Sequence, residues 1–321
     1  MDDKLVREIE KAEKRIRPYV LKTPLMESPY ISQLSKAHIY LKLESEQYTG
    51  SFKIRGATNK ILSLTNDEKT KGVITASTGN HGQALAKALK STQTKGIVYV
   101  PENADQSKID AIRRYGAEVE YYGKNSLETE MYAKNKAKEK SAIWVSPYND
   151  FQIVAGQGTI SIELLEQLEN IDAVFVTIGG GGLISGIGTH LKTKSPKTKI
   201  IGCLPENSAE MYECIKTRNF VESNNKETIS DGSAGGFEQG SITYEICKQV
   251  VDDFVLVTEE EIKNAIKLMI DIHHKIIEGA AGVALASFLK VRQNYEDKNV
   301  VIVICGGNIS TDKLKEILLL E

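Results

Sequence analysis

The chain has 321 residues, with 41 basic and 43 acidic side chains and a formal net charge of −2 at pH 7. This length allows a large buried core and favours two domains. The balanced, interspersed charge argues against nucleic-acid binding, and no apolar run approaches the roughly 20 residues of a membrane-spanning helix, so we expect neither a nucleic acid nor a membrane as partner.

The four cysteines, Cys203, Cys214, Cys247 and Cys305, are scattered along the chain without paired spacing. The five histidines likewise lack the spacing of zinc ligands. Scattered cysteines are typical of reduced thiols, and the charged N-terminus does not resemble a signal peptide. We therefore expect a cytoplasmic protein without a bound metal.

Short β-branched runs alternate with helical patterns along the chain. The predicted strands are His38–Leu43, Gly72–Ala76, Gly96–Val100, Glu118–Tyr122, Ala142–Val145, Ala173–Ile178, Lys199–Leu204, Phe254–Val257 and Val300–Cys305. The clearest helices between strands are predicted over Ala104–Tyr115, Leu127–Lys140 and Glu259–Ile277. This alternation favours an α/β fold of open parallel sheets covered by helices on both faces.

Nine strands are many for one compact sheet, so we expect two sheets in two domains. No linker rich in Pro or Gly separates two halves of the chain, which favours an inserted domain. We predict a small domain over residues 66–147 and a large domain over residues 1–65 and 148–321. The longest irregular stretch is Glu222–Gly240, and loops of this length in compact domains are often functional.

Lys53 is the most informative single residue, in the run Ser51-Phe52-Lys53-Ile54-Arg55-Gly56-Ala57. An apolar setting disfavours the charged form of a lysine and lowers its pKa. A neutral amine is a nucleophile that forms a Schiff base with an aldehyde such as that of pyridoxal phosphate. The alternative from this segment alone is a helix lysine whose stem lies on apolar surface.

A polar turn, Ser77-Thr78-Gly79-Asn80-His81-Gly82-Gln83, follows the predicted strand Gly72–Ala76 and opens a helix. The N–H groups at the start of a helix bind carboxylates and phosphates. The carboxyl ends of parallel strands are also where open α/β folds bind ligands. A plain N-cap would explain one hydroxyl, whereas the additional Asn, His and Gln favour an anion site.

Four consecutive glycines, Gly179-Gly180-Gly181-Gly182, lie with Leu183 between the predicted strand Ala173–Ile178 and a helical run. Several N–H groups can face one concavity there because no side chain blocks the approach. The spacing does not match a nucleotide-binding loop, and a tight turn needs fewer glycines. The pattern therefore predicts a phosphate site.

Two further features leave their alternatives open. Cys305, followed by Gly306-Gly307-Asn308, ends a predicted strand and is either a ligand contact or a small buried apolar residue. Glu278, in Ile276-Ile277-Glu278-Gly279-Ala280, is either a helix N-cap or a functional carboxylate.

These segments, in this order, resemble the fold-type II pyridoxal-phosphate enzymes, and within them the threonine/serine dehydratases and serine racemases. The resemblance extends from Leu21-Lys22-Thr23-Pro24-Leu25 to Asn308. It implies a fold like that of the tryptophan synthase β-subunit, a homodimer, and pyridoxal 5'-phosphate as cofactor. The implied reaction is the dehydration and deamination of a β-hydroxy amino acid such as L-threonine or L-serine to a 2-oxo acid and ammonia.

The resemblance also implies roles for individual residues. Lys53 would be the Schiff-base lysine and the acid/base at the α-carbon, and Thr78 would be a second catalytic residue. The implied cofactor contacts are Phe52, Lys53, Asn80, Gly179, Gly180, Gly181, Gly182, Leu183 and Cys305, with Cys305 facing the pyridine nitrogen. The implied substrate contacts are Ser77, Thr78, Asn80, His81 and Gly235.

Departures from the family pattern affect substrate and metal. Thr78 stands where serine racemases have serine and many dehydratases have alanine. Leu204 stands where the family's cation site has an acidic residue, so we expect no metal even though Glu210 matches a second ligand. Gly279 replaces a proline common in relatives, and together with the turn at Ser77 it resembles the dehydratases of hydroxyectoine breakdown. This makes threo-3-hydroxyaspartate a candidate substrate.

Three alternatives remain beside the dehydratase. Thr78 keeps a hydroxyl group, so a serine or aspartate racemase is the next hypothesis. A β-replacement synthase of the cysteine-synthase kind is disfavoured, because those enzymes usually have threonine in place of His81. A relative that binds the cofactor without turnover is disfavoured by the retention of Lys53 with the glycine loop.

Overall fold

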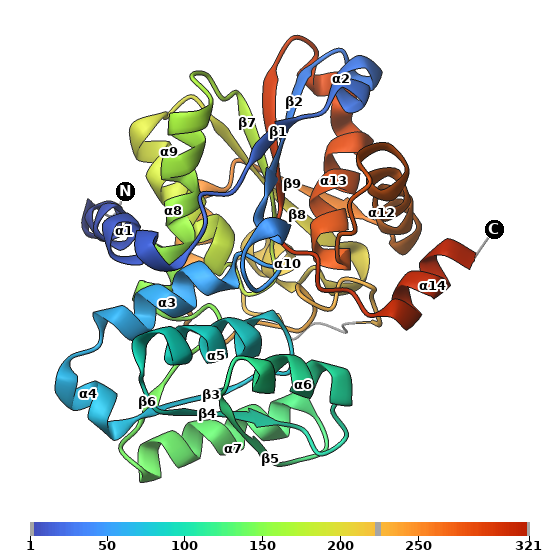
Figure 1. The fold of residues 1–321 in the computed structure, drawn as a ribbon. Coiled ribbons are helices and arrows are strands. Elements are labelled where there is room, and N and C mark those ends of the chain that lie inside the picture. Colours follow the sequence, from blue (N-terminus) through green and yellow to red (C-terminus); the bar gives the residue numbers. More distant parts are fainter. Residues whose placement is uncertain (1–2, 222–225, 320–321) are drawn as a thin grey trace.

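The computed structural model describes residues 3–221 and 226–319. The first two residues of the charged N-terminus and residues 222–225 of the predicted loop lie outside these described residues. Strands and helices alternate through the described chain and form two sheets (Figure 1). The predicted α/β fold is thereby confirmed.

The larger sheet has six strands in the order β1-β2-β10-β7-β8-β9. Its strands are β1 (Leu25–Glu27), β2 (His38–Leu43), β7 (Ala173–Thr177), β8 (Lys199–Pro205), β9 (Asp253–Val257) and β10 (Asn299–Ile304). Every neighbouring pair is parallel except β1 with β2. All five residues of β7 are buried, as expected for an apolar run in a sheet covered on both faces.

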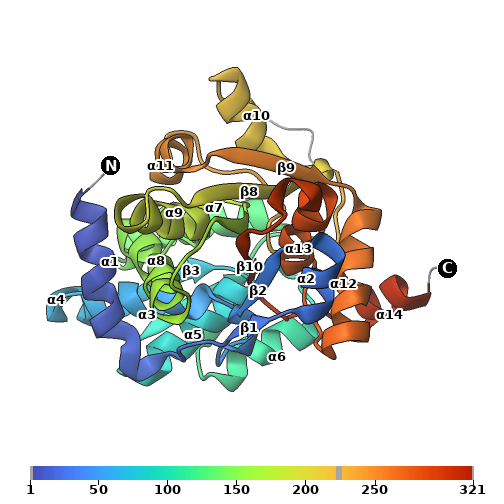
Figure 2. The same ribbon diagram turned by 90° about the horizontal axis from the view of Figure 1, so that it is seen from above.

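Helices cover both faces of this sheet. Helices α8 (Phe151–Gln167) and α9 (Gly182–Lys194) lie on one face, and α12 (Glu259–His273) and α13 (Gly279–Val291) lie on the other (Figures 1 and 2). The Asp150 carboxylate caps α8 by accepting from the backbone N–H groups of Gln152 and Ile153 at 2.8 and 3.1 Å. The remaining elements around this sheet are α1 (Asp3–Ile16), η1 (Arg17–Tyr19), α2 (Pro29–Ser35), η2 (Glu44–Glu46), η3 (Glu206–Ser208), α10 (Glu210–Thr217), α11 (Ile242–Val250), η4 (Arg292–Tyr295) and α14 (Thr311–Leu319).

The smaller sheet has four parallel strands in the order β5-β4-β3-β6. Its elements are α4 (Asn66–Lys71), β3 (Val73–Ala76), α5 (Asn80–Thr92), β4 (Gly96–Val100), α6 (Gln106–Arg114), β5 (Glu118–Tyr121), α7 (Ser126–Glu139) and β6 (Ile143–Trp144). Helices α5 and α6 cover one face and α7 covers the other (Figure 1). Helix α3 (Lys53–Ser63) packs against both α5 and α8, so it connects the two halves of the molecule.

All nine predicted strands are present, with ends within one residue of the prediction. The analysis missed β1, whose three residues are too short for a periodic pattern. The helix predicted over Glu259–Ile277 was too long at its end, because His274 adopts a left-handed conformation (φ 52°) that ends α12.

The strands of the four-stranded sheet all fall between residues 73 and 144, and those of the six-stranded sheet fall outside that range. On this basis we retain, as a proposal, domains of residues 1–65 with 148–321 and of residues 66–147. Within the described ranges, none of the helices combines the length and the apolar character needed to cross a membrane.

Candidate functional site

A cavity of about 940 Å³ opens where strands of both sheets end. Its wall includes residues that follow β3 in the smaller sheet and residues that follow β7 and β10 in the larger. Every site residue predicted from the sequence lines this cavity, namely Phe52, Lys53, Ser77, Thr78, Asn80, His81, Gly179, Gly180, Gly181, Gly182, Leu183, Gly235 and Cys305. The structure thus brings the separate motifs together, while their individual roles remain proposals.

Lys53 is the first residue of α3, and its Nζ donates a hydrogen bond to the Pro147 carbonyl at 2.9 Å. Burial lowers the pKa of Lys53 to about 8, although the nearby acidic groups of Cys305 and Glu278 act to raise it. At pH 7 this leaves roughly a tenth of the amine uncharged, against roughly 0.03% for an ordinary lysine. The Phe52 ring lies beside it, with its centroid 5.3 Å from Nζ.

The segment before Lys53 is held to the end of β10. The Phe52 N–H donates to the Cys305 carbonyl at 3.0 Å, and Ser51 forms an antiparallel bridge with Gly306. These contacts place the lysine and the cysteine on the same part of the cavity wall. A contact across 250 residues of sequence cannot be read from either local pattern.

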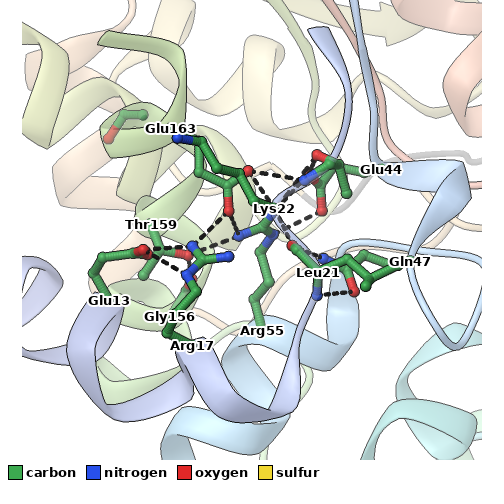
Figure 3. Close-up of polar contacts among 12 residues, drawn as sticks. Glu13, Arg17, Leu21, Lys22, Glu44, Gln47, Arg55, Gly156, Thr159 and Glu163 are labelled. Carbon is green, nitrogen blue, oxygen red and sulfur yellow. Dashed lines mark hydrogen bonds and ion pairs between the residues drawn. The ribbon is translucent and has the colours of Figure 1, made fainter. Parts of the chain in front are cut away.

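The other side of α3 is fixed by a buried cluster of charges (Figure 3). The Arg55 guanidinium donates to both carboxylate oxygens of Glu44 at 2.8 Å and to both of Glu163 at 2.7 and 2.9 Å. Lys42 Nζ donates to Glu163 at 2.6 Å. All four side chains are fully buried, and two positive charges meet two negative ones.

This cluster joins four elements, because Lys42 lies on β2, Glu44 on η2, Arg55 on α3 and Glu163 on α8. The opposing carboxylates raise the pKa of Arg55 above its ordinary value, and Arg55 lowers the pKa of Glu163 to about 2 despite burial. Arg55 and Glu163 therefore stay ionised across the physiological range. Sequence analysis missed it, because charged residues in helices usually face solvent.

The turn Ser77–Asn80 connects β3 to α5 and faces the cavity. Ser77 Oγ accepts from the Gly79 N–H at 3.2 Å, and α5 starts at Asn80. Gly82 is required here, since a Cβ at that position would lie 2.4 Å from the Ser77 carbonyl oxygen. The free N–H groups of the first helical turn can bind an anion.

His81 follows this turn as the second residue of α5, and its imidazole lies within hydrogen-bonding distance of groups in the smaller sheet. Its Nε2 lies 3.1 Å from Thr75 Oγ1 and 3.3 Å from the Val145 carbonyl oxygen. Burial and the nearby charge of Lys53 lower the pKa of His81 to about 3, so the ring is neutral. The predicted contact of His81 with substrate stays a proposal, and backbone N–H groups are better placed in this turn than its ring nitrogen Nε2.

The glycine loop follows β7 and begins α9, whose N-cap Gly181 is left-handed (φ 82°). The loop is tightly packed, because a Cβ on Gly180 would lie 2.4 Å from the Tyr148 ring and one on Gly179 would lie 2.9 Å from Ser233 Cα. A side chain at these positions would displace the loop. The residues present therefore form a backbone cradle at a helix N-terminus that fits a phosphate group.

Sequence analysis missed Tyr148, whose ring packs behind this loop. Its hydroxyl accepts from the Glu238 backbone N–H at 2.8 Å, and the Glu238 carboxylate in turn accepts from Asn149 at 2.9 Å and Lys134 at 2.6 Å. The signal available in the sequence was its position just after the predicted strand Ala142–Val145. A residue that follows a parallel strand in a two-sheet fold lies on the ligand side of the sheet.

Cys305 directly follows β10 and is buried. Burial and the charge of Glu278 raise the pKa of its thiol well above the ordinary value, so the group is neutral. Gly235, in the loop before α11, has a left-handed conformation (φ 90°) and lines the cavity, and a Cβ added there would meet no atom within 4 Å. The roles of Cys305 as a neutral partner and of Gly235 as a ligand contact stay predictions.

Two alternatives were left open for Glu278, a helix N-cap and a functional carboxylate, and the structure excludes capping by its side chain. It precedes α13, yet its side chain makes no capping hydrogen bond. Both carboxylate oxygens instead accept from Asn80 Nδ2 at 2.9 Å, across the cavity wall. Burial raises the pKa of Glu278 to about 7, against hydrogen bonds from Asn80 and Asn308 and the charge of Lys53.

This shift predicts a pH-dependent contribution to stability. A carboxyl group whose pKa rises from 4.5 to about 7 on folding stabilises the protein fully below pH 4.5 and loses that contribution as the pH rises through 7. The wild type should therefore lose about 3 kcal/mol relative to Glu278→Gln between pH 4.5 and pH 8. Urea unfolding of both cofactor-free proteins across this range measures it, and a constant difference would contradict the assignment.

In the part of the chain that the structure describes, no three His, Cys, Asp or Glu side chains are grouped so that they could hold a metal ion. Leu204 is buried at the end of β8, and Glu210 packs beside Gly236, whose Cβ would lie 2.4 Å from its carboxylate. The expectation that no metal binds remains a prediction.

Comparison with known proteins places the site in context. Residues 16–306 match the model of a family described as pyridoxal-phosphate dependent enzymes. A catabolic L-threonine dehydratase of Staphylococcus aureus is 43% identical over 315 residues, covering 97% of this chain and 91% of the relative.

Solved structures are also similar to this chain over almost its whole length. A serine racemase from Dictyostelium discoideum is 39% identical, with a TM-score of 0.88, and the match covers 95% of this chain and 98% of that one. The processed form of threonine deaminase isoform 2 from Solanum lycopersicum is 33% identical, with a TM-score of 0.94, covering 99% of this chain and 93% of that one. Matches of this extent involve the whole described fold rather than one motif.

Proposed function

Because this chain belongs to the family of pyridoxal-phosphate dependent enzymes, we propose that it dehydrates and deaminates a small β-hydroxy amino acid, L-threonine or L-serine. The products are a 2-oxo acid and ammonia. The observation that carries the proposal is the meeting of a partly neutral Lys53, a glycine cradle and a neutral Cys305 in one cavity. The similarity to a catabolic L-threonine dehydratase supports the choice of substrate class.

The cavity wall fits the cofactor group by group. The backbone of Gly179–Leu183 would hold its phosphate, the amine of Lys53 would bind its aldehyde, and the ring of Phe52 would pack beside its own ring. Asn80 and Cys305 supply polar groups for the ring hydroxyl and the pyridine nitrogen. When bound, the cofactor makes the α-hydrogen of an attached amino acid acidic by accepting the developing negative charge.

The chain itself then supplies proton transfer and orientation. The uncharged fraction of Lys53 is the base that takes the α-proton. N–H groups and hydroxyls of the turn at Ser77 and Thr78 orient the substrate carboxylate at the start of α5. The neutral thiol of Cys305 would leave the pyridine nitrogen of a bound cofactor unprotonated, which would favour loss of the hydroxyl over transamination.

Racemisation is a second candidate, favoured by one observation. Thr78 carries a hydroxyl group on the wall of the same cavity as Lys53, so two acid/base groups are available to the α-carbon. The similarity to a serine racemase supports this candidate as well. L-threo-3-hydroxyaspartate is a further candidate substrate for the elimination.

A substrate panel tests the function. Purified, cofactor-loaded protein is incubated separately with L-threonine, L-serine and L-threo-3-hydroxyaspartate, and 2-oxo acid release is followed in each. We expect release from at least one of the first two, and the kcat/KM values rank the three substrates. No release from any of them would contradict the dehydratase, and appearance of the D-enantiomer without ammonia would establish the racemase.

We also propose a cytoplasmic homodimer. The four buried, free cysteines support a reducing compartment. Support for the dimer comes from the resemblance to the family alone. Light scattering coupled to size-exclusion chromatography would contradict it by giving the mass of a single 35.5 kDa chain.

A further inference from the structure

Glu278 has a buried carboxylate for which the reaction proposed above has no use. Its side chain is buried to 93%, and it lies between the end of β10 and the start of α13. A Cβ on Gly306 would lie 2.5 Å from one of its oxygens, and one on Gly232 would lie 3.4 Å away. Because residues 232 and 306 are glycines, no side chain occupies the space beside the carboxylate at either position.

The partner of this carboxylate, Asn80, is held at both ends of its amide. Nδ2 of Asn80 donates to the two Glu278 oxygens at 2.9 Å, and its Oδ1 accepts from Asn308 Nδ2 at 2.7 Å. Asn308 Nδ2 also donates to the Thr49 carbonyl at 2.8 Å. If the Asn80 amide were turned by 180°, its oxygen would face the Glu278 carboxylate and its nitrogen would face Asn308 Nδ2. Neither pair could form a hydrogen bond, so only one orientation of the amide is compatible with its neighbours.

We propose that Glu278 is a positioning residue whose ionised carboxylate fixes the Asn80 amide so that it presents an N–H donor, never an acceptor, to the bound cofactor. An amide nitrogen carries two hydrogens, and the two Glu278 oxygens, at equal distance from Nδ2, share one of them, so the other remains for a ligand. A donor at this point selects an acceptor on the ligand, which for the proposed cofactor is its ring oxygen in the ionised form. The inference rests on the proposed function, because it takes Asn80 as a cofactor contact.

The proposal makes the orientation depend on the charge of Glu278. A protonated carboxyl group donates from one oxygen and would oppose the Asn80 donor. The charged and titratable groups that act on Glu278 are Lys53, which favours its ionised form, and Asp231, which disfavours it. The buried thiol of Cys305 also faces it and is neutral. The pKa near 7 places this change within the working range of pH.

Glu278→Gln is the direct test, because glutamine keeps the size and removes the charge. Cofactor-free protein is titrated with pyridoxal phosphate to obtain Kd, and the absorbance spectrum of the bound cofactor is recorded from pH 5.5 to 9. We expect Kd to rise about tenfold or more and the spectral transition near pH 7 to disappear. Asp231→Asn is the matched control, since it removes a carboxylate from the same cavity without contacting Asn80. It should keep the affinity and retain the transition, moved to lower pH because Asp231 disfavours ionised Glu278.

Asn308→Ala provides a second variant that leaves Glu278 intact. It removes the other anchor of the amide, so it should also weaken cofactor binding, and the double variant should lose less than the product of the two single losses. The proposal is overturned if Glu278→Gln keeps the wild-type Kd and transition, or if it fails to fold and Asn308→Ala binds like the wild type. Both readouts need only cofactor binding, so a wild type that binds the cofactor but releases no 2-oxo acid would refute the proposed function and not this inference.

Discussion

Replacing Lys53 with alanine is expected to lower kcat for 2-oxo acid release by about 10³-fold or more. The variant loses the nucleophile that would hold the cofactor and the base that would take the α-proton. Burial lowers the pKa of Lys53 to about 8, so the wild-type amine is available for both roles near neutral pH. Steady-state kinetics with L-threonine and L-serine, at saturating cofactor, measure the loss.

Lys60→Ala is the matched control, because Lys60 lies on the same helix and carries the same charge. It forms an ion pair with Asp150 at 2.5 Å and does not line the cavity. We expect this variant to keep the wild-type kcat. A Lys53→Ala variant with wild-type activity would remove Lys53 from the mechanism, and equal losses in both variants would point to a defect of α3 as a whole.

Replacing Arg55 with methionine is expected to destabilise the protein by about 3–5 kcal/mol. The substitution leaves Glu44 without its ion-pair partner, while Glu163 keeps Lys42 and the partly exposed Arg17. Removing one partner of a buried ion pair is costly because the remaining charge has no water around it. Urea unfolding of the cofactor-free protein, by circular dichroism, gives the change in the free energy of unfolding.

The variant Arg17→Met tests whether burial, rather than charge alone, causes the loss of stability in Arg55→Met. Arg17 also donates to Glu163, at 2.7 Å, but its side chain is 32% exposed, so its loss should cost about 1 kcal/mol or less. Combining Arg55→Met with Glu44→Gln should recover part of the loss, since one unbalanced charge is removed. Equal effects of Arg55→Met and Arg17→Met would show that the cluster is not the source of the stability.

The strands and the cavity-lining motifs could be predicted from the sequence because their signals are local. Runs such as residues 173–176 are apolar throughout, and the four glycines that follow the strand have few other uses. Since all parallel strands of a sheet end on one side, motifs at strand ends converge even when their separation in sequence is large. The nine predicted strands and the shared cavity follow from these two rules.

Contacts between distant side chains could not be predicted in this way. Glu278 and Asn80 are 198 positions apart, and the local pattern around Glu278 is equally compatible with an N-cap. Arg55 and Glu163 are 108 positions apart, and each by itself looks like an exposed helix residue. The imidazole of His81 is committed to Thr75 and Val145, which depends on the register between β3 and β6.

The most direct test of the proposed dehydration is its product balance. Cofactor-loaded protein is incubated with L-threonine, and in a parallel sample with L-serine, and ammonia, 2-oxo acid and D-enantiomer are quantified over time. The proposed dehydration predicts equal amounts of ammonia and 2-oxo acid, with the D-enantiomer a minor product. Accumulation of D-enantiomer without ammonia, or no conversion of either amino acid, would contradict it.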